Sequence, residues 1–596
     1  MVKINEGNPK KIWGILNKIL CRDVNENANV DTTSHNSKEF ADFFREKVEK
    51  IKLSTGGFGD PTFVHCQLNE PFSGFSECTQ VDVKAIIMSS PAKTCFLDCM
   101  PTNIFKKYID LFLPFLTSLI NLCLSTGNFP SGCKHAIVVP LLKQSSLDGN
   151  DKKNYRPVSN LSFISKVIER IVAKQLLFFL HSNNLMPQCQ SGYRRFHSSE
   201  TALLHVLSNL YSASDAKQIS LLALLDMSAA FDCVDHITLL RRLSSSYGIS
   251  GNVYAWFESY LNKRSQQIYY NNVLSDNEFI ASGVPQGSVL GPILFILYVA
   301  DVFEIIERFG FKGHAYADDI QVVASCPPVL FDEMTDKFLD CLSCVDIWMA
   351  QNGIRLNQCK TQLLPVGTWQ QISKIDANSL SINGTHINFC KFATNLGFTI
   401  DGNLSMHEHI KGLVKSCSNQ LRELRLIRKS LSQVTLAGLM HSFIHSRLDY
   451  CNSLFYGISD KELSLLQSVQ NRAAKVVVGG LKFDHVTQTL AELHWLPVGK
   501  RIVFKIGVLM YKCLNGMAPQ YLMNKCVFKN TLFQTHDLRS NDANFLMVPL
   551  NRLKIGSRNF SIFGPNIWNS FPCHLRHPGL TLLSFKKELK TYLFTL

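Results

Sequence analysis

Short apolar runs alternate with amphipathic segments between about residue 134 and residue 400. The runs AIVVPLL, ISLLALLDM and HAYADDIQVVAS have the length and the branched residues that are typical of buried β-strands. Between them, SKVIERIVAKQLLFFL repeats its apolar residues at the spacing of a helix. This mixture predicts an α+β domain that contains a β-sheet and ends near residue 400.

The segments on either side of this domain are predicted to be mainly helical. FADFFREKVEKI precedes the domain, and HIKGLVKSCSNQLRELRLIRKSL and KELSLLQSVQNRAAKVVVG follow it; all three have a helical pattern. A chain of 596 residues is too long for one ordinary core. We therefore divide it into four parts: residues 1–125, 126–400, 401–480 and 481–596.

The positive charge of the chain is concentrated in its last third. Residues 401–596 contain 25 Lys and Arg against 11 Asp and Glu, whereas residues 1–400 contain 36 of each. Such an asymmetry indicates a surface that binds a polyanion, although a basic solubilising surface would carry the same charge. On one predicted helix, three of four basic residues share a face, and we take all four as candidates for nucleic-acid binding: Arg422, Arg425, Arg428 and Lys429.

The sequence predicts neither a membrane span nor a secretion signal. The longest apolar stretch, Leu111 to Leu124, contains a proline and is shorter than the roughly 20 residues of a membrane helix. We expect a buried helix there and no membrane partner. The start of the chain, MVKINEGNPKK, lacks the apolar run of a signal peptide. The protein is therefore expected inside the cell, in the nucleus, the cytoplasm or both, and not secreted.

Acidic residues stand at the ends of two apolar runs. Asp226 directly follows ISLLALL, and Asp318 and Asp319 stand together in the link between two strand-like runs. Carboxylates in such places are costly unless they are paired, solvated or bound to metal. Phosphoryl transfer uses two cations about 3.5–4 Å apart, and Mg²⁺ takes oxygen ligands from a few carboxylates and substrate phosphates. The three acids predict such a site, although most acidic pairs in turns are solvated surface.

Three motifs resemble those of the reverse transcriptases of non-LTR retrotransposons, the LINE-type elements of the jockey or CR1 kind. Tyr316–Asp319, with the sequence YADD, resembles their YxDD box, and Leu225–Asp232, with the sequence LDMSAAFD, resembles their first catalytic motif. Ser282–Pro292, with the sequence SGVPQGSVLGP, resembles their template and nucleotide motif. Further similarity, from about residue 130 to the end, includes VVPLLK, NYRPVSNLSFISKVIERIV, QSGYRRFHSSETALL, LNQCKT and NLGFTIDGNLSMHEHI.

The resemblance implies a right-hand polymerase fold and an RNA-directed DNA polymerase, which adds deoxynucleotides to a primer 3′-hydroxyl. Residues 126–400 would form the fingers and palm, residues 401–480 a helical thumb, and residues 481–596 a mainly helical C-terminal accessory domain. Residues 1–125 would be an extension or linker that follows a missing endonuclease. The implied partners are an RNA template, a DNA primer, deoxynucleoside triphosphates and the element's RNA in a ribonucleoprotein.

The same motifs assign the catalytic residues. Two ions, Mg²⁺ or Mn²⁺, would be held by Asp226, Met227, Asp318 and Asp319. Lys360, in LNQCKT, would protonate the pyrophosphate leaving group or neutralise its charge. Asp232 and Asp235 belong to the first motif without having to bind metal, and Asp232 is a candidate cap for the following helix.

The nucleotide would be bound by five residues: Lys143, Arg156, Phe231, Gln286 and Gly287. The side chains of Lys143 and Arg156 would bind the triphosphate, because Lys and Arg form strong hydrogen bonds with phosphate oxygens. Phe231 would close over the 2′ position of the sugar and exclude ribonucleotides, although a core phenylalanine would look the same in sequence. Gly283 and Gly287 would let the backbone approach the nascent base pair.

Two other functions remain open at this point. An RNA-directed RNA polymerase shares the palm, but the YADD sequence and Phe231 argue against it. A catalytically inactive, RNA-binding remnant of a retrotransposon could keep all three acids and still have lost its activity.

Overall fold

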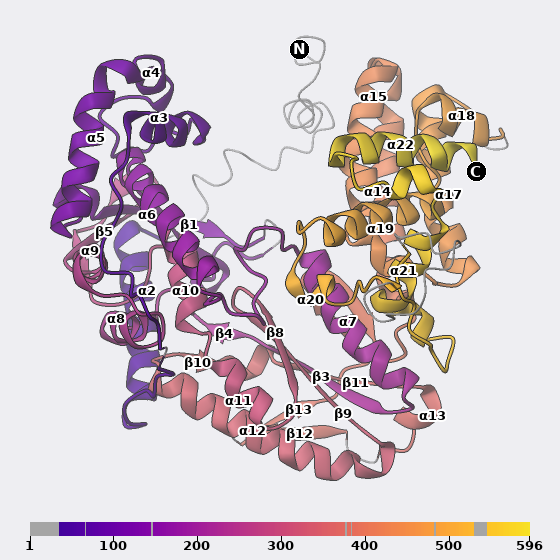
Figure 1. Cartoon of the computed structure of the whole chain (residues 1–596), viewed down its shortest axis with the longest axis horizontal. Coiled ribbons are helices and arrows are strands. Elements are labelled where there is room, and N and C mark those ends of the chain that lie inside the picture. The colour runs from indigo at the N-terminus through magenta and orange to yellow at the C-terminus, as the bar shows by residue number, and fades with distance from the viewer. Residues whose placement is uncertain are drawn as a thin grey trace.

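The computed structural model describes residues 35–529 and 545–596, except residues 66, 145–146, 376–377, 383 and 482–483. The segment MVKINEGNPKK lies outside the described residues, so the expectation that it is not a secretion signal stays a prediction. Figure 1 shows one lobe of mainly N-terminal helices and one lobe of C-terminal helices, with strands between them at the base. This arrangement confirms the predicted α+β class with a helical C-terminal part.

The central sheet lies between the two lobes. It consists of four antiparallel strands in the order β11 (Gln362–Val366), β3 (Ile219–Leu225), β9 (Asp319–Cys326) and β8 (Lys312–Tyr316). Strand β3 is apolar except for Ser220, because both faces of the sheet are covered. Leu221 and Ala223 belong to one core cluster with α12 (Phe331–Gln351), whereas Leu222 belongs to another with α7 (Ser199–Asp215).

A second sheet forms the fingers. Its strands are β2 (Tyr155–Asn160), β1 (His135–Leu142), β5 (Arg264–Tyr270) and β6 (Val273–Leu274) in that order, with β7 (Glu278–Ile280) also paired to β5. Helix α2 (Ser37–Thr55) packs on this sheet through the fully buried Phe40. The Phe40 ring lies 4.9 Å from Tyr155 and 4.7 Å from Tyr270. Residues well before position 126 are thus part of the fingers.

The helices that follow α2 also pack into the main core. Val83 of α3 (Gln80–Ser89) and Ile120 of α5 (Ile109–Thr126) share a hydrophobic cluster with Ile168 of α6 (Phe163–Ser182) and the central sheet. Of the two predicted forms of residues 1–125, an extension or a linker, these helices therefore fit a packed extension. Their apolar faces are buried against the fingers and palm, which a linker would not be.

Helix α5 differs from the buried helix that was predicted. It runs unbroken past Pro114 for 18 residues, and only 39% of it is buried. Leu111, Phe115 and Leu122 on its outer face are exposed. Among the described residues it is the one helix long and apolar enough to cross a membrane, but core helices of soluble proteins meet the same criteria.

The C-terminal lobe is built from packed helices. The longer ones are α14 (His407–Ile427), α15 (Gln433–Met440), α17 (Asp460–Val478), α19 (Val498–Leu514), α21 (Phe560–Ser570) and α22 (Leu582–Thr595). Leu424, Val469 and Ile506 lie in one hydrophobic cluster, so the core continues across residue 480. The hairpin of β14 (Phe392–Asn395) and β15 (Phe398–Asp401) joins this lobe to the palm.

The other described elements are short. The helices are α4 (Thr102–Lys107), α8 (His236–Ser245), α9 (Gly251–Leu261), α10 (Gly291–Tyr298), α11 (Val302–Arg308), α13 (Trp369–Ile372), α16 (Ser446–Leu448), α18 (Thr487–Glu492) and α20 (Gln520–Met523). The strands are β4 (Met227–Ser228), β10 (Arg355–Leu356), β12 (Ser379–Ile382) and β13 (Thr385–Asn388).

The junction between palm and C-terminal lobe can be tested at Phe398. This side chain is fully buried, and its ring lies 4.0 Å from that of His409. We expect Phe398→Ala to cost about 3–5 kcal/mol of stability because it leaves a cavity, and to lower the calorimetric unfolding midpoint. Phe392→Ala, on the same hairpin but 53% exposed, should change the midpoint little. Equal effects of the two changes would contradict this packing.

Candidate active site

The pairing of strands brings the three predicted acids to one edge of the central sheet. Leu225 pairs with Ile320, and Tyr316 pairs with Asp319. Asp226 follows Leu225, so it leaves β3 beside the point where Asp319 begins β9. Asp318 lies in the turn between β8 and β9. The sequence prediction that separate apolar runs deliver their acids to one site is consistent with this register.

Asp226 is held by two neighbours from the segment after β10. Asn357 donates from Nδ2 to Asp226 Oδ2 at 3.0 Å, and Lys360 Nζ lies 3.1 Å from the same oxygen. Met227, the next residue, has a buried side chain. Its thioether is a poor ligand for Mg²⁺, so any contribution of Met227 to a metal site would come from its main-chain carbonyl.

The carboxylates repel one another. Burial raises the pKa of Asp318, and the charge of Asp226 adds to the shift. Desolvation by the surrounding protein raises the pKa of Asp319 to about 6, with further contributions from Asp318 and Asp226. Such repulsion is relieved when a cation binds between the acids.

The donor set fits Mg²⁺ or Mn²⁺, because all three side chains offer hard oxygen ligands. Within the described residues, no three Asp, Glu, His or Cys side chains form a ready-made metal cluster. Mg²⁺ seldom requires one, since it is commonly bound by one or two carboxylates together with substrate phosphates and water. The arrangement suits ions that arrive with a nucleotide.

Cations surround the acids. The positive charges of Lys360 and Arg156 act to lower the pKa of both Asp318 and Asp319. Burial lowers the pKa of Lys143, and the charge of Lys47 is the next largest cause, followed by Lys360 and Arg156. The structure therefore gathers the three predicted cations at one site and adds Lys47 of α2.

Lys47 was missed because its helical sequence pattern does not show where α2 docks. Lys360 was predicted to act on the leaving group, and here it is paired with Asp226. Lys143 donates from Nζ to the Lys153 carbonyl at 2.5 Å. Both amines thus have protein partners in this state, which they would exchange for phosphate oxygens.

The second motif packs directly on the first. Gln286 Nε2 donates to Asp232 Oδ1 at 2.8 Å, and the Gln286 carbonyl accepts from Ser159 N at 2.8 Å. Burial raises the pKa of Asp232 to about 6. Asp232 was named as a candidate cap for the following helix, but the cap of α8 is Asp235, which accepts from Thr238 N at 2.8 Å. The helix begins three residues later than that prediction required.

The glycines of the second motif are required by protein contacts. A Cβ on Gly283 would lie 2.9 Å from the Asp232 carbonyl oxygen, and one on Gly287 would overlap that of Ser159. Both residues also have positive φ, of 89° and 137°, which glycine adopts without strain. The sequence predicted that these two glycines would let the backbone approach a base pair. In the structure they let the loop backbone approach Asp232 and Ser159 closely.

Phe231, five residues after Asp226, is half-buried. Its ring stacks on Phe295 with centroids 4.4 Å apart and meets Tyr193 edge-on at 6.3 Å. It therefore packs against the core, as the alternative interpretation required.

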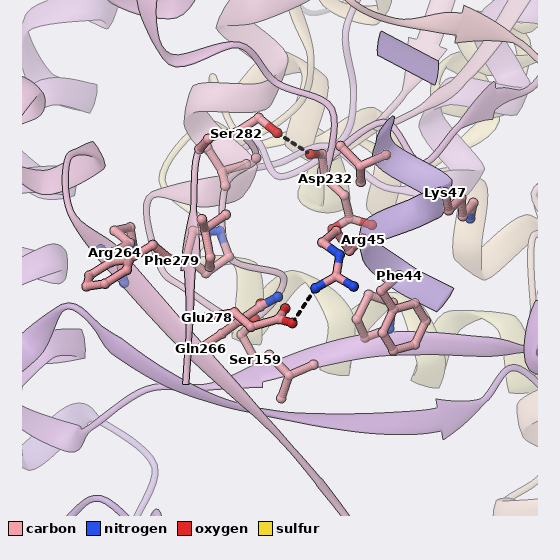
Figure 2. A pocket seen from close by; sticks show the side chains of 18 of the residues that line it. Phe44, Arg45, Lys47, Ser159, Asp232, Arg264, Gln266, Glu278, Phe279 and Ser282 are labelled. Atoms are coloured by element: carbon pink, nitrogen blue, oxygen red, sulfur yellow. Dashed lines mark hydrogen bonds and ion pairs between the residues drawn. The ribbon is translucent and has the colours of Figure 1, made fainter. Parts of the chain in front are cut away.

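Two hollows flank the catalytic motifs. One, of about 380 Å³, is lined by Asp226, Asp319, Lys360 and residues 394–396 of the hairpin between palm and C-terminal lobe. The other, of about 400 Å³, lies between α2 and the second motif (Figure 2). Asp232 lines the latter, and Arg45 Nη1 donates to Glu278 Oε1 across it at 2.8 Å.

The four predicted nucleic-acid-binding residues are not equivalent. Arg422 and Arg425 on α14, and Lys429 just beyond it, are exposed, and none of the three forms an ion pair with a carboxylate of the described chain. Arg428 lies against Gly479, where a Cβ would overlap its guanidinium. That position is at the C-terminal end of α17, where a cation is stabilised by the helix dipole.

The fold and the site define a class. A four-stranded antiparallel palm, covered by helices on both faces, carries three acids at one edge, with Lys360 paired to Asp226 and the charge of Arg156 close enough to act on Asp318 and Asp319. This arrangement is compatible with a nucleotidyl-transferring polymerase, in which acidic residues bind divalent metal ions.

Comparison with known proteins narrows this class. Residues 142–388 match the family described as reverse transcriptase (RNA-dependent DNA polymerase). The chain is 26% identical over 371 residues to the probable RNA-directed DNA polymerase from transposon BS of Drosophila melanogaster, covering 61% of this chain and 40% of that protein. It is 27% identical over 403 residues to the RNA-directed DNA polymerase from mobile element jockey of the same species, covering 66% and 42%.

Residues 142–388 thus carry a reverse transcriptase domain, and the chain is similar to RNA-directed DNA polymerases of mobile elements, as its motifs indicated. It spans about 40% of the length of these relatives. Among solved structures, a telomerase from Candida tropicalis truncated from its C-terminal domain is similar at 13% identity, covering 52% of this chain and 60% of that one. The TM-score of the two structures is 0.32.

The raised pKa of Asp319 predicts a pH-dependent stability in metal-free protein. A folded pKa of about 6 exceeds the unfolded value of about 3.9, so protonation contributes stability that is complete below about pH 4 and lost as pH rises through 6. Asp319→Asn removes this loss. Its melting temperature should exceed that of the wild type by more at pH 7.5 than at pH 5, and Mg²⁺ should narrow the difference.

The exposed Asp340 of α12 provides the control. Asp340→Asn should shift the melting temperature equally at both pH values. A difference between wild type and Asp319→Asn that is constant from pH 5 to pH 7.5 would contradict the repulsion among the three acids.

Proposed function

We propose that this chain is an RNA-directed DNA polymerase that copies an RNA template by extending a DNA primer. The observation that carries the proposal is the meeting of Asp226, Asp318 and Asp319 at one sheet edge, inside the region that matches the reverse transcriptase family. Both relatives compared above are named as RNA-directed DNA polymerases.

Each part of the site has a role in this reaction. Two divalent ions, Mg²⁺ or Mn²⁺, would supply activation of the primer 3′-hydroxyl and stabilisation of the leaving oxygen. Asp226, Asp318 and Asp319 would hold them. Arg156 and Lys143 would bind the triphosphate, because charge-assisted hydrogen bonds to phosphate are strong. Lys360 would move from Asp226 to the pyrophosphate oxygens as that group leaves.

The choice of deoxynucleotides would rest on Phe231. Its ring is fixed between Phe295 and Tyr193, so it cannot turn aside to admit a 2′-hydroxyl without breaking this packing. Gln286 and Gly287 would act through the loop that they lock on Asp232 and Ser159. With Phe231 placed over the sugar, this packing would favour deoxynucleotides over ribonucleotides.

The template and primer would extend from the acids toward the C-terminal lobe. Arg422, Arg425 and Lys429 provide an exposed basic face there, and phosphate contacts supply most of the affinity of such surfaces. The partners would be an RNA template, a DNA primer and the element's RNA in a ribonucleoprotein. We propose action inside the cell, in the nucleus or the cytoplasm, without a membrane partner.

Removal of one carboxylate tests the reaction. Asp318→Asn deletes a metal ligand while leaving the cations that contact phosphate, so primer extension on RNA should fall by more than about 100-fold. Binding of the primer–template, measured by fluorescence anisotropy, should stay within about twofold. Asp340→Asn should retain full extension. A wild-type chain that binds primer–template but never extends it would favour the inactive remnant.

Charge removal tests the nucleic-acid surface. Changing Arg422, Arg425 and Lys429 together to Gln should weaken binding and reduce the slope of log affinity against log salt by about 0.7–0.9 per lost contact. The rate at saturating primer–template should stay near normal. Changing Lys586, Lys587 and Lys590 of α22 to Gln removes the same charge from the same lobe and should leave the slope unchanged. Equal slopes for both triple variants would assign the first group to solvated surface.

A further inference from the structure

We infer that Gln190 is a positioning residue that holds the catalytic turn between β8 and β9, an inference that rests on the proposed function of the acids. No role was evident for this residue in the sequence QSGYRRFHSSETALL. It does not reach substrate itself. It acts through the main chain of Ala317, the residue immediately before Asp318.

Residues 189–192 lie along the open edge of β8. Ser191 N donates to the Ala315 carbonyl at 2.8 Å, and Ala315 N donates to the Cys189 carbonyl at 2.7 Å. Gln190 forms a parallel bridge with Ala315. The segment thus adds a short fifth strand to the palm, directly beside the end of β8 that leads into the turn.

The Gln190 side chain is fully buried and binds the turn at both ends of its amide. Its Oε1 accepts from Ala317 N at 2.8 Å and from Gly192 N at 2.8 Å, while its Nε2 donates to the Ala317 carbonyl at 3.1 Å. One side chain therefore satisfies both polar groups of Ala317. A primary amide is suited to this task because it carries a donor and an acceptor at one end.

The turn needs such support. Ala317 has φ of 58°, a left-handed conformation that non-glycine residues keep only when their surroundings impose it. Any other conformation of Ala317 would break its hydrogen bonds to a buried amide, which is costly. Because Asp318 follows directly, the conformation of Ala317 sets the direction in which that carboxylate leaves the turn.

Gly192 completes the contact from the other side. A Cβ at this position would overlap the Ala317 nitrogen, so the segment can approach the turn only because residue 192 is glycine. Gly192 has an ordinary φ, and substitution there would act through this overlap and not through backbone strain.

The C-terminal lobe anchors the same segment. Ser191 Oγ lies 2.8 Å from the hydroxyl of Tyr521 on α20 and 2.9 Å from His314 Nε2 on β8. Hydrogen bonds to the C-terminal lobe and to β8 thus fix Ser191, and the peptide chain connects Ser191 directly to Gln190. Gln190 in turn bonds Ala317, the residue before the catalytic acids.

Gln190→Met in the full chain tests the inference, since it keeps the length of the side chain and removes all three hydrogen bonds. Mn²⁺ affinity, measured by electron paramagnetic resonance, should fall about 10–100-fold, as expected when an outer partner of a metal ligand is lost. Amide exchange in a peptide covering residues 314–320 should become faster. In primer extension, kcat should fall while KM for the nucleotide stays within about twofold.

Two further variants separate positioning from general destabilisation. Ser220→Ala removes a buried hydroxyl that bonds Ser325 in the same sheet, roughly 20 Å along β3 from Asp226, and should leave Mn²⁺ affinity unchanged. Gly192→Ala should weaken Mn²⁺ binding as Gln190→Met does, because its Cβ would overlap the Ala317 nitrogen. If Gln190→Met does not fold, the Mn²⁺ affinity of Gly192→Ala tests the inference instead. Mn²⁺ affinity and exchange rates that equal the wild type in the folded variants would overturn the inference.

The metal-binding and exchange measurements do not require polymerase activity. If the wild-type chain bound Mn²⁺ at the acids but did not extend primers, the proposed function would fail while the role of Gln190 was still tested. If extension was normal and Gln190→Met changed neither affinity nor exchange, only the role of Gln190 would fail.

Discussion

The antiparallel pairing of β3 with β9 fixes the position of everything else in the site. Side chains alternate along a strand, so a slip of one residue would move Asp226 away from Asp319 and turn every buried residue of β3 to the opposite face. Both faces of this sheet are covered, by α7 on one side and α12 on the other. The register is therefore specified by two cores at once, and the catalytic acids are placed by packing that lies far from them.

This placement carries an energetic penalty that the surroundings offset. Asp318 and Asp319 have raised pKa values because they are partly desolvated and close to another carboxylate. Lys360 and Arg156 reduce the repulsion, and Asn357 donates a hydrogen bond to Asp226. The left-handed Ala317 adds strain at the same point. A site of this kind is less stable empty than with cations bound, which couples the binding of metal and nucleotide to the order of the turn.

The sequence predicted those features that depend on local pattern. The apolar runs and helical spacings identified β1, β3, β8, β9, α2, α6, α14 and α17, and the motifs identified the three acids. Features that depend on contacts between distant segments were not predictable. The docking of α2 brings Lys47 to the site. The Arg428 guanidinium packs against Gly479 at the end of another helix. Gln190 bonds Ala317, which lies more than a hundred residues away in the sequence. The capping of α8 by Asp235 instead of Asp232 was within reach, since Asp235 stands just before the helical spacing begins.

The central claim is that two strand ends and one turn form a single site for divalent cations. Cleavage of the protein backbone by Fe²⁺ bound in place of Mg²⁺, in the presence of ascorbate and peroxide, tests it most directly, because the radicals cut only peptide bonds close to the ion. The account predicts cuts near residue 226, near residues 318–319 and near residues 357–360 in the same sample, all suppressed by excess Mg²⁺ and by Asp226→Asn. Cuts at only one of these segments, or cuts that excess Mg²⁺ does not suppress, would contradict it.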